Sequence, residues 1–298
     1  MPESSTAAVL QQAREMRTLV DAALDRYTQF DADCPANLRD AIRHSLLAPC
    51  KRLRPVLVLM AAEACGCSNE AAMPAACAVE MIHTYSLIHD DLPAMDDDDM
   101  RRGLPSCHAK YGEATAILAG DALLALAFEV MAAGIEPADR AARCCRELAQ
   151  AAGATALVGG QADDLAAENG GGGLEHLEAI HRRKTGAMFR VSLRLGGVVA
   201  GANETTLRNL DCYGENLGLA FQIVDDLLDL HGDEAALGKR AQKDAGRGKL
   251  TFPSLLGEEE SRRRAVTLVD RACEAVSEFG SRAGGLESLA RYVLERNH

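Results

Sequence analysis

The sequence has a shortage of positive charge. Its 298 residues include 44 Asp and Glu against 32 Lys and Arg, so the formal net charge at pH 7 is −12. Nucleic acids and anionic membranes are bound largely through clustered basic residues. This balance argues against such a partner, and the few local basic clusters are better suited to a small anion.

Paired cysteines, a secretory signal and long apolar runs are also missing. The ten cysteines lack the spacing of a zinc site, since Cys65-Gly-Cys67 has the wrong gap and Cys144 and Cys145 are adjacent. The first residues are polar and acidic, unlike a signal peptide. No uninterrupted apolar run reaches the length of a membrane span. We therefore expect a cytoplasmic protein with reduced cysteines and no membrane span.

Sustained alternation of polar and apolar residues, which is typical of β-strands, is absent as well. Apolar residues instead recur at helical spacing. The glycine-rich segment 169–173 lacks the Gly-Lys-Ser/Thr continuation of a phosphate loop and is interpreted as a connector. With no repeat and no long linker, the sequence predicts an all-α, single-domain helical bundle over residues 1–298. The expected helices span residues 7–30, 36–47, 55–64, 73–91, 113–133, 138–168, 174–199, 204–230, 253–281 (with a possible break near Gly257) and 286–296.

Two aspartate clusters lie in apolar surroundings. The first is Asp90-Asp91-Leu-Pro-Ala-Met-Asp96 with three further aspartates, and the second is Asp225-Asp226-Leu-Leu-Asp229. Crowded carboxylates that resist desolvation need compensation by cations. Oxygen ligands suit Mg²⁺, which completes its coordination with water and phosphate oxygens. Two such clusters facing one cavity would hold Mg²⁺ ions around a diphosphate.

The two clusters differ in local geometry. Asp225 and Asp229 are four residues apart and share one helical face. Asp96 can return toward Asp90 because Pro93 interrupts the helix between them. The alternative is a solvated acidic turn, which is the favoured interpretation for residues 96–99 taken alone.

Basic residues alternate with the acidic clusters along the chain. Lys51 and Arg54 are one helical turn apart and could grip one phosphate together. Arg101 and Arg102 directly follow the first acidic run. Each pair alone is more typical of a solvated surface. Their alternation with the aspartates favours a diphosphate site.

Four further polar residues are candidates for the same cavity. His83, seven residues before Asp90, could donate to a phosphate, although a lone helical histidine more often sits satisfied in the core. Lys184-Thr185-Gly186 interrupts a helical stretch, and a kink there would free carbonyl groups that can stabilise positive charge. Gln222, three residues before Asp225, could contribute its amide oxygen.

Six ordered segments resemble one known family. The segment His83-Thr-Tyr-Ser-Leu-Ile-His-Asp-Asp-Leu-Pro-Ala-Met-Asp resembles the first aspartate-rich motif of the trans-isoprenyl diphosphate synthases, and Gly218-Leu-Ala-Phe-Gln-Ile-Val-Asp-Asp-Leu-Leu-Asp229 resembles the second. The other four are residues 51–55, 181–186, 237–239 and 249–253. Four residues separate the aspartate pair from Asp96, and in this spacing the first motif resembles that of the bacterial farnesyl diphosphate synthases. The resemblance covers the chain from about residue 24 to its end.

The resemblance implies a homodimer whose helices surround a central cavity, with Mg²⁺ as cofactor, about three ions per active site. Its substrates are isopentenyl diphosphate and an allylic diphosphate, either dimethylallyl or geranyl. The implied metal ligands are Asp90, Asp96 and Asp225, supported by Asp91, Asp226 and Asp229. The implied allylic-diphosphate ligands are Arg101, Lys184, Lys239 and Lys249. Isopentenyl diphosphate is assigned to Lys51, Arg54, His83 and Arg102. The carbocation is assigned to Thr185 and Gln222.

The product length is assigned to Tyr85 and Ser86. Tyr85 lies five residues before Asp90, about 7.5 Å along a helix. A ring there would stop a growing tail, whereas the small Ser86 leaves room for a C10 chain to enter. In the resembled family an aromatic residue at this place accompanies a C15 product, so we predict farnesyl diphosphate. Core packing of Tyr85 is the alternative explanation of its position, and geranyl and geranylgeranyl diphosphate are the alternative products.

Departures from the family pattern remove no charged group and no implied metal ligand. Pro49-Cys50 stands where Gly-Gly is usual, which puts a backbone contact to isopentenyl diphosphate in question. Phe252 and Leu250 replace a common tyrosine and serine. A terpene cyclase normally carries an Asn/Asp-Ser-Glu motif at the second cluster, and a non-catalytic partner subunit would lose aspartates. The sequence therefore predicts an active enzyme.

Overall fold

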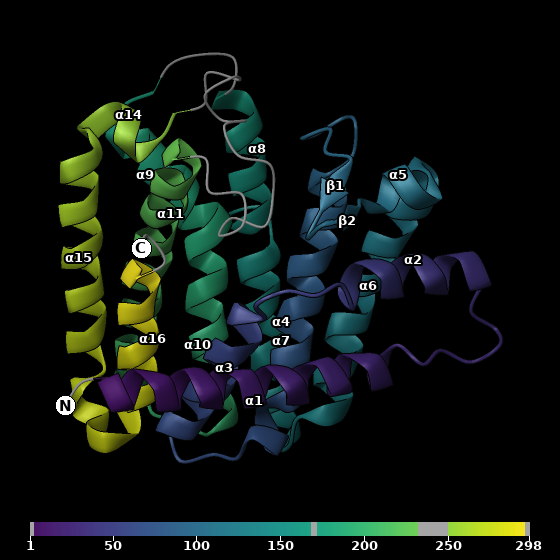
Figure 1. Ribbon diagram of the computed structural model, residues 1–298. Helices are drawn as coiled ribbons and strands as arrows, with labels where there is room; N and C mark the ends of the chain where they lie inside the picture. Colours follow the sequence, from purple (N-terminus) through teal and green to yellow (C-terminus); the bar gives the residue numbers. More distant parts are fainter. Residues whose placement is uncertain (1–2, 168–171, 232–249, 296–298) are drawn as a thin grey trace.

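The computed structural model describes residues 3–167, 172–231 and 250–295 (Figure 1). Within these ranges the chain is helical except for one short hairpin and the connecting turns. The first half contains α1 (Glu3–Tyr27), α2 (Ala36–Leu46), α3 (Leu53–Ala64), α4 (Asn69–Asp90), β1 (Met100–Arg101), β2 (Leu104–Pro105), α5 (Cys107–Tyr111) and α6 (Glu113–Gly134). The second half contains α7 (Ala138–Ala152), α8 (Leu157–Ala167), α9 (Leu174–His181), the π-helical turn η1 (Arg182–Gly186), α10 (Ala187–Val199), α11 (Glu204–His231), α14 (Phe252–Leu256), α15 (Glu258–Ala275), the 3₁₀ helix η2 (Ser277–Ala283) and α16 (Gly284–Glu295).

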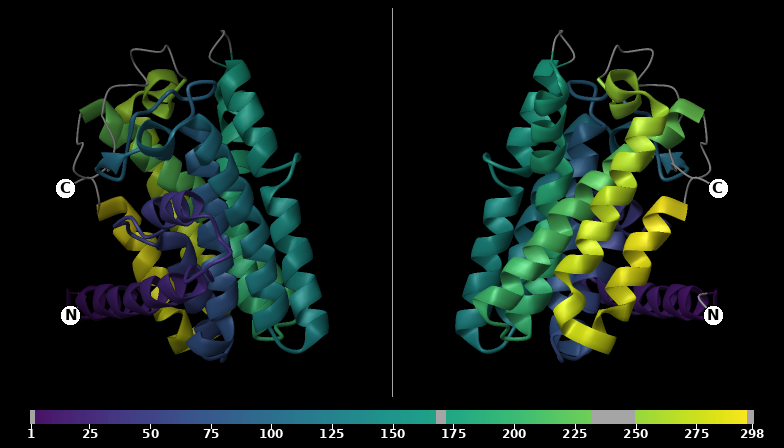
Figure 2. Two further views of the ribbon diagram at one scale, coloured as in Figure 1. Left: turned by 90° about the vertical axis from the view of Figure 1, so that its right-hand side faces the viewer. Right: turned by 90° about the vertical axis from the view of Figure 1, so that its left-hand side faces the viewer.

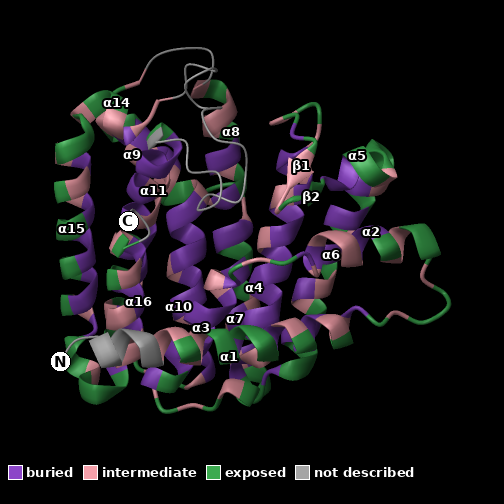
Figure 3. Ribbon diagram, in the orientation of Figure 1, coloured by how far each residue is buried: buried purple, intermediate pink, exposed green. Residues whose placement is uncertain are grey.

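Helices α4 and α10 form the centre of the bundle. Helix α4 packs against α3, α6 and α10, and α10 packs against α3, α7 and α11. The buried faces of these helices meet in one aliphatic core (Figure 3). Close packing between α10 and α3 depends on Gly196, because a Cβ there would lie 2.3 Å from the carbonyl oxygen of Val58. Burial of this apolar surface is the main force that holds the helices together.

The two helices that carry the aspartate clusters end on the same side of the bundle. Helices α4 and α11 both run toward the end where β1, α8 and α14 lie, whereas α1 crosses the opposite end (Figures 1 and 2). The first cluster follows α4 directly, and the second lies in the last turns of α11. The topology therefore brings two distant parts of the sequence to one end of the molecule.

Several predicted helix boundaries need correction. The helix predicted over residues 138–168 is two helices, because the chain turns at Gly153, where the amide of Ala156 donates to the Gly153 carbonyl at 3.1 Å. Helix α4 begins before residue 73, since the Ser68 hydroxyl caps it by accepting from the Ala71 amide at 3.3 Å. The predicted break at Gly257 is present, with φ of 81°.

The hairpin of β1 and β2 and the short helix α5 were not predicted. Each strand has two residues, and Arg101 pairs with Leu104 in antiparallel register. The turn between them has positive φ at both Arg102 (55°) and Gly103 (76°), as a two-residue hairpin turn requires. Strands this short leave no alternation to detect in the sequence. Their effect is to fix the backbone of two predicted substrate ligands.

Helix α6 qualifies the expectation that the chain has no membrane span. Its length and composition alone would allow it to cross a membrane, with a mean hydropathy of 1.9, and 39% of that stretch is buried inside the protein. Core helices of soluble proteins meet the same criteria. It packs against α2, α4, α5 and α7. The helix also exposes two large apolar side chains, Ile117 and Leu118.

Candidate active site

The loop after α4 folds back on the end of that helix. The amide of Asp96 donates to the carbonyl of Asp90 at 2.7 Å, and the amide of Asp98 donates to the carbonyl of Asp91 at 3.1 Å. Asp97 takes a left-handed backbone conformation with φ of 48°. The return of the chain after Pro93 agrees with the sequence prediction. It brings the backbone of Asp96 beside Asp90.

Asp90 lies buried between two polar side chains from other helices. Its carboxylate accepts from the Gln161 amide at 2.8 Å and lies 3.5 Å from the Lys184 ammonium. Burial raises the pKa of Asp90 above its ordinary value, and the positive charge of Lys184 counteracts part of that rise. The Asp96 carboxylate acts in the same direction as burial. This carboxylate would therefore gain from an additional cation.

Asp91 is occupied by an ion pair with Arg101. The Arg101 Nε lies 3.0 Å from the Asp91 carboxylate, and a second guanidinium nitrogen also contacts it. Burial nevertheless raises the pKa of Asp91 to about 6. Arg101 is fixed in orientation by this contact and by the hairpin. Asp91 therefore holds the Arg101 guanidinium in place at the rim of the first cluster.

Lys184 stands on the π-helical turn η1, where the sequence predicted a kink. Its ammonium lies 2.8 Å from Asp164 as well as near Asp90, and these two carboxylates outweigh burial and raise its pKa. Close approach of α8 to η1 depends on Gly160, since a Cβ there would lie 2.5 Å from the Lys184 amide nitrogen. π-Helical turns inside α-helices are frequent at functional sites.

Sequence reasoning missed Gln161 and Asp164 on α8. The available signal was the segment Gly159-Gly160-Gln161 with Asp164 one turn further, which places both polar groups on one helical face. Their role in the structure is to position Asp90 and Lys184. The sequence predicted one long helix over residues 138–168. No packing partner could be assigned to the face that carries Gln161 and Asp164, so their role was not recognised.

The residue after Lys184 connects η1 to the second cluster. The Thr185 hydroxyl donates to the Gln222 side-chain oxygen at 2.6 Å. Neighbouring residues of one π turn therefore contact the first cluster and α11, respectively. Asp226 and Asp229 are buried, and Asp226 accepts from the Phe252 amide at 2.9 Å.

The predicted ligands Lys239 and Lys249 lie outside the described residues. Lys51 is exposed at the surface before α3. The remaining predicted ligands of isopentenyl diphosphate come from α3, α4 and the hairpin, and they lie close to one another.

Arg54 and His83 form a partly buried pair. The Arg54 guanidinium lies 3.1 Å from His83 Nε2 and 5.3 Å from the centre of the Phe189 ring. Burial lowers the pKa of Arg54 to about 10, and burial together with neighbouring arginines lowers the pKa of His83. Arginine has only donors, so Nε2 of a neutral His83 accepts and its Nδ1–H is available to donate. The pair is suited to binding an anion.

A buried carboxylate beneath this pair was also missed. Glu80 is 1% exposed and accepts from Arg52 at 2.7 Å and from Arg102 at 3.2 Å. Arg52 also donates to Asp21 at 2.8 Å. Burial alone would raise the pKa of Glu80, but the two arginines outweigh it and lower the pKa. The available signal was a glutamate in an apolar helix, three residues before His83.

Tyr85 and Ser86 lie in the buried part of α4 below the first cluster. Tyr85 is 6% exposed, and its ring meets the His89 ring edge-to-face at 5.7 Å between centroids. The Ser86 hydroxyl donates to the His83 carbonyl at 2.8 Å. Tyr85 thus belongs to the core and also lies five residues, about 1.4 helical turns, before Asp90 on α4.

The residues fit Mg²⁺ bound together with a diphosphate. Within the part of the chain that the structure describes, no three His, Cys, Asp or Glu side chains form a ready-made metal cage. Mg²⁺ commonly takes only one or two carboxylates and completes its coordination with water and phosphate. Buried carboxylates with raised pKa values, as at Asp90 and Asp91, suit that mode because a cation would stabilise their ionised form.

Two aspartate motifs and several basic side chains at one end of a helical bundle suit the binding of a diphosphate together with Mg²⁺. Comparison with known proteins agrees, since the polyprenyl synthetase family matches residues 35–279. The chain is 45% identical to the farnesyl diphosphate synthase of Escherichia coli (strain K12) over 294 residues, covering 95% of this chain and 98% of that protein. It is 48% identical over 286 residues to geranylgeranyl pyrophosphate synthase 9, chloroplastic, of Arabidopsis thaliana, covering 94% and 79%.

Comparison with solved structures also shows a similar fold. The FPP/GFPP synthase from Zymomonas mobilis superposes with a TM-score of 0.88 at 37% identity, covering 97% of this chain and 99% of that one. The chain belongs to the polyprenyl synthetase family. The predicted family, the all-α fold and the prenyltransferase activity are thereby confirmed.

Proposed function

We propose that this prenyltransferase condenses dimethylallyl and geranyl diphosphate with isopentenyl diphosphate and releases farnesyl diphosphate. The observation that supports this best is the bridge made by η1. Lys184 reaches Asp90 of the first motif at 3.5 Å, and Thr185 reaches Gln222 beside the second at 2.6 Å. An allylic diphosphate between the two motifs would have its anionic end among cations and its allylic carbon near hydroxyl and amide oxygens.

The allylic diphosphate is assigned to the aspartate end. Asp90, Asp96 and Asp225 would hold Mg²⁺, which supplies charge stabilisation to the leaving pyrophosphate. Lys184 binds a phosphate oxygen in its charged form, because Asp90 and Asp164 keep its pKa raised. Arg101, oriented by Asp91, provides a second cation at the rim. Fixed charges of this kind stabilise a leaving group without reorganisation.

Isopentenyl diphosphate is assigned to the basic side. Arg54 and the Nδ1–H of His83 donate to its phosphates, joined by Lys51 and Arg102. Glu80 holds Arg102 in place at 3.2 Å. The two negatively charged substrates would thus be bound by separate sets of positively charged groups. This arrangement keeps their phosphates apart and brings their reacting carbons together.

The intermediate cation would face oxygen atoms rather than a base. The Thr185 hydroxyl donates a hydrogen bond to the Gln222 side-chain oxygen, so the oxygen lone pairs of Thr185 remain available to the allylic carbon. The allylic C–O bond breaks and its electron pair leaves with the pyrophosphate, and attack by the isopentenyl double bond on the allylic carbon forms the new carbon–carbon bond. The proton then lost from the former isopentenyl unit is accepted by the departing pyrophosphate.

The C15 product rests on Tyr85. Its buried ring lies below Asp90 on α4, where a lengthening tail would extend. Replacing Tyr85 by alanine is expected to shift the main product from C15 to C20, because removing the ring opens the floor of the pocket. The measurement is chromatographic product length from dimethylallyl and isopentenyl diphosphates with Mg²⁺.

Tyr85→Phe is the matched control, since it keeps the ring and removes only the hydroxyl. We expect it to retain the C15 product. An unchanged C15 product from Tyr85→Ala would contradict the floor role. Substantial C20 or C10 product from the unaltered protein would instead contradict the proposed product and favour a geranylgeranyl or geranyl diphosphate synthase.

We further propose that the protein acts as a homodimer through α6. Leu118 on this apolar helix is 57% exposed, and Ile117 is 44% exposed. Leu118→Arg is expected to convert dimer to monomer, because a charge cannot be buried unpaired in such an interface. Size-exclusion chromatography with light scattering measures the mass. Val266→Arg, on α15 and 45% exposed, should leave the dimer intact, and equal behaviour of the two variants would contradict this interface.

A further inference from the structure

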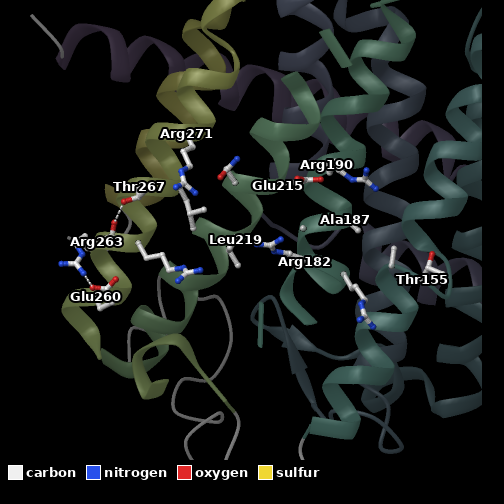
Figure 4. Close-up of a pocket in the computed structure, with 16 residues that line it drawn as sticks. Thr155, Arg182, Ala187, Arg190, Glu215, Leu219, Glu260, Arg263, Thr267 and Arg271 are labelled. Atoms are coloured by element: carbon white, nitrogen blue, oxygen red, sulfur yellow. Dashed lines mark hydrogen bonds and ion pairs between the residues drawn. The ribbon is translucent and has the colours of Figure 1, made fainter. Parts of the chain in front are cut away.

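A large arginine-lined groove lies on a different face of η1 from the candidate active site. Its volume is about 700 Å³, within the range of small-molecule sites. Figure 4 shows side chains from η1, α10, α11 and α15 pointing into it. The arginines that line it are Arg182, Arg183, Arg190, Arg263, Arg264 and Arg271. Neither Lys184 nor Thr185 lines this groove, although both belong to η1.

The groove is basic in a strongly acidic protein. Only two carboxylates, Glu215 and Glu260, line it beside the six arginines. Four of the arginines are paired: Arg183 with Asp163, Arg263 with Glu260, and both Arg182 and Arg264 with Glu178. Over the described ranges of the chain, Arg190 and Arg271 have no carboxylate within ion-pair distance. The groove therefore keeps a local excess of positive charge.

The arrangement indicates the chemistry of an occupant. Arginine forks bind phosphate oxygens in bidentate fashion. Thr155, Thr267 and Asn216 add hydroxyl and amide donors to the lining. The net charge of −12 opposes a long polyanion that would extend over the rest of the surface. A compact anion with several phosphates matches the groove in size and charge.

We propose that this groove is a second anion site, which binds a compact polyphosphate group, either inorganic or as part of a nucleotide. Arg190 and Arg271 are its principal ligands, approaching from α10 and α15. The site is separate from the substrate-binding residues and does not depend on the product that the enzyme forms. Arg182 and Arg183 belong to the same π turn, η1, as Lys184. An anion bound in the groove would therefore contact the turn that positions Lys184 in the active site.

Calorimetric titration of the full-length protein with inorganic triphosphate, in EDTA and without substrates, tests the site. We expect saturable binding in the groove, distinct from any triphosphate bound by the basic residues of the active site. Arg190→Ala/Arg271→Ala should weaken binding at least about tenfold, as expected when two charge-assisted contacts are lost. Arg190→Lys/Arg271→Lys should weaken it less, because the charge remains. The matched control Arg14→Ala/Arg17→Ala removes two exposed arginines of α1 and should change affinity less than about twofold.

A converse variant separates the groove from the active site. Arg54→Ala should leave triphosphate affinity unchanged, while it impairs the condensation reaction. If Arg54→Ala abolishes the titration and the groove variant does not, the proposal is wrong, whatever the product assay shows. Equal weakening by the groove variant and by the α1 control also overturns it. A parallel titration with ATP identifies the source: tighter binding than triphosphate indicates that the nucleoside is also recognised.

Discussion

Asp225→Ala is expected to lower kcat by on the order of 10³-fold, the largest effect on activity that we predict. Asp225 lies in the last turns of α11, three residues after Gln222, and we assign it to Mg²⁺. Losing this ligand removes stabilisation of the leaving pyrophosphate at the step where its charge develops. Steady-state assays over a range of Mg²⁺ concentrations measure the loss.

Two comparisons make this experiment specific. Asp270→Ala removes an exposed carboxylate from α15 and should leave kcat unchanged. Thermal unfolding of both variants in the absence of Mg²⁺ shows whether the fold is retained. Near-normal turnover of Asp225→Ala at saturating Mg²⁺ would rule out its assignment as a metal ligand.

Glu80→Ala is expected to destabilise the protein by about 3–5 kcal/mol, the largest effect on stability that we predict. Its carboxylate is the shared partner of Arg52 and Arg102. Truncation would leave the 2% exposed Arg52 with a buried charge that the 2.8 Å contact to the partly exposed Asp21 only partly offsets. Urea unfolding followed by circular dichroism measures the change in the free energy of unfolding.

A matched pair of measurements identifies the cause. Asp40→Ala removes an exposed partner of Arg39 and should change stability by less than about 1 kcal/mol.

The contribution of Glu80 should also depend on pH. Its pKa in the folded state is lowered from 4.5, so the stabilisation is complete above that value and lost as pH falls through the folded pKa. A pH-independent difference between Glu80→Ala and the unaltered protein would contradict this explanation.

Local patterns predicted the helices and the aspartate motifs. Apolar residues at helical spacing identify α4, α6 and α11, since a helix must bury one face. Pro93 predicted the return of the chain toward Asp90, because proline prevents continuation of the helix. Gly186 predicted an irregularity beside Lys184, and the structure has a π turn there. Each of these inferences depends on residues only a few positions apart.

Other parts of the site could not be predicted in that way. Gln161 and Asp164 become meaningful only when α8 approaches η1 closely enough to meet Asp90 and Lys184. Glu80 carries no local signal of its ion pairs within an apolar helix, because its arginine partners lie 28 and 22 positions away. The hairpin that holds one of those partners has strands too short to show a periodic pattern.

By itself, the sequence determined that this protein is all-helical and carries two aspartate motifs, because the charges and helical periodicities that define them are local. The prenyltransferase activity was indicated only by the resemblance of these motifs to the trans-isoprenyl diphosphate synthases. Only the tertiary structure decided which charges are paired and which remain available. Arg101 is paired with Asp91, whereas Arg190 and Arg271 come together at the groove from helices far apart in the chain. The physical reason is that an ion pair or an anion site depends on distances of a few ångströms, and those distances follow from helix packing.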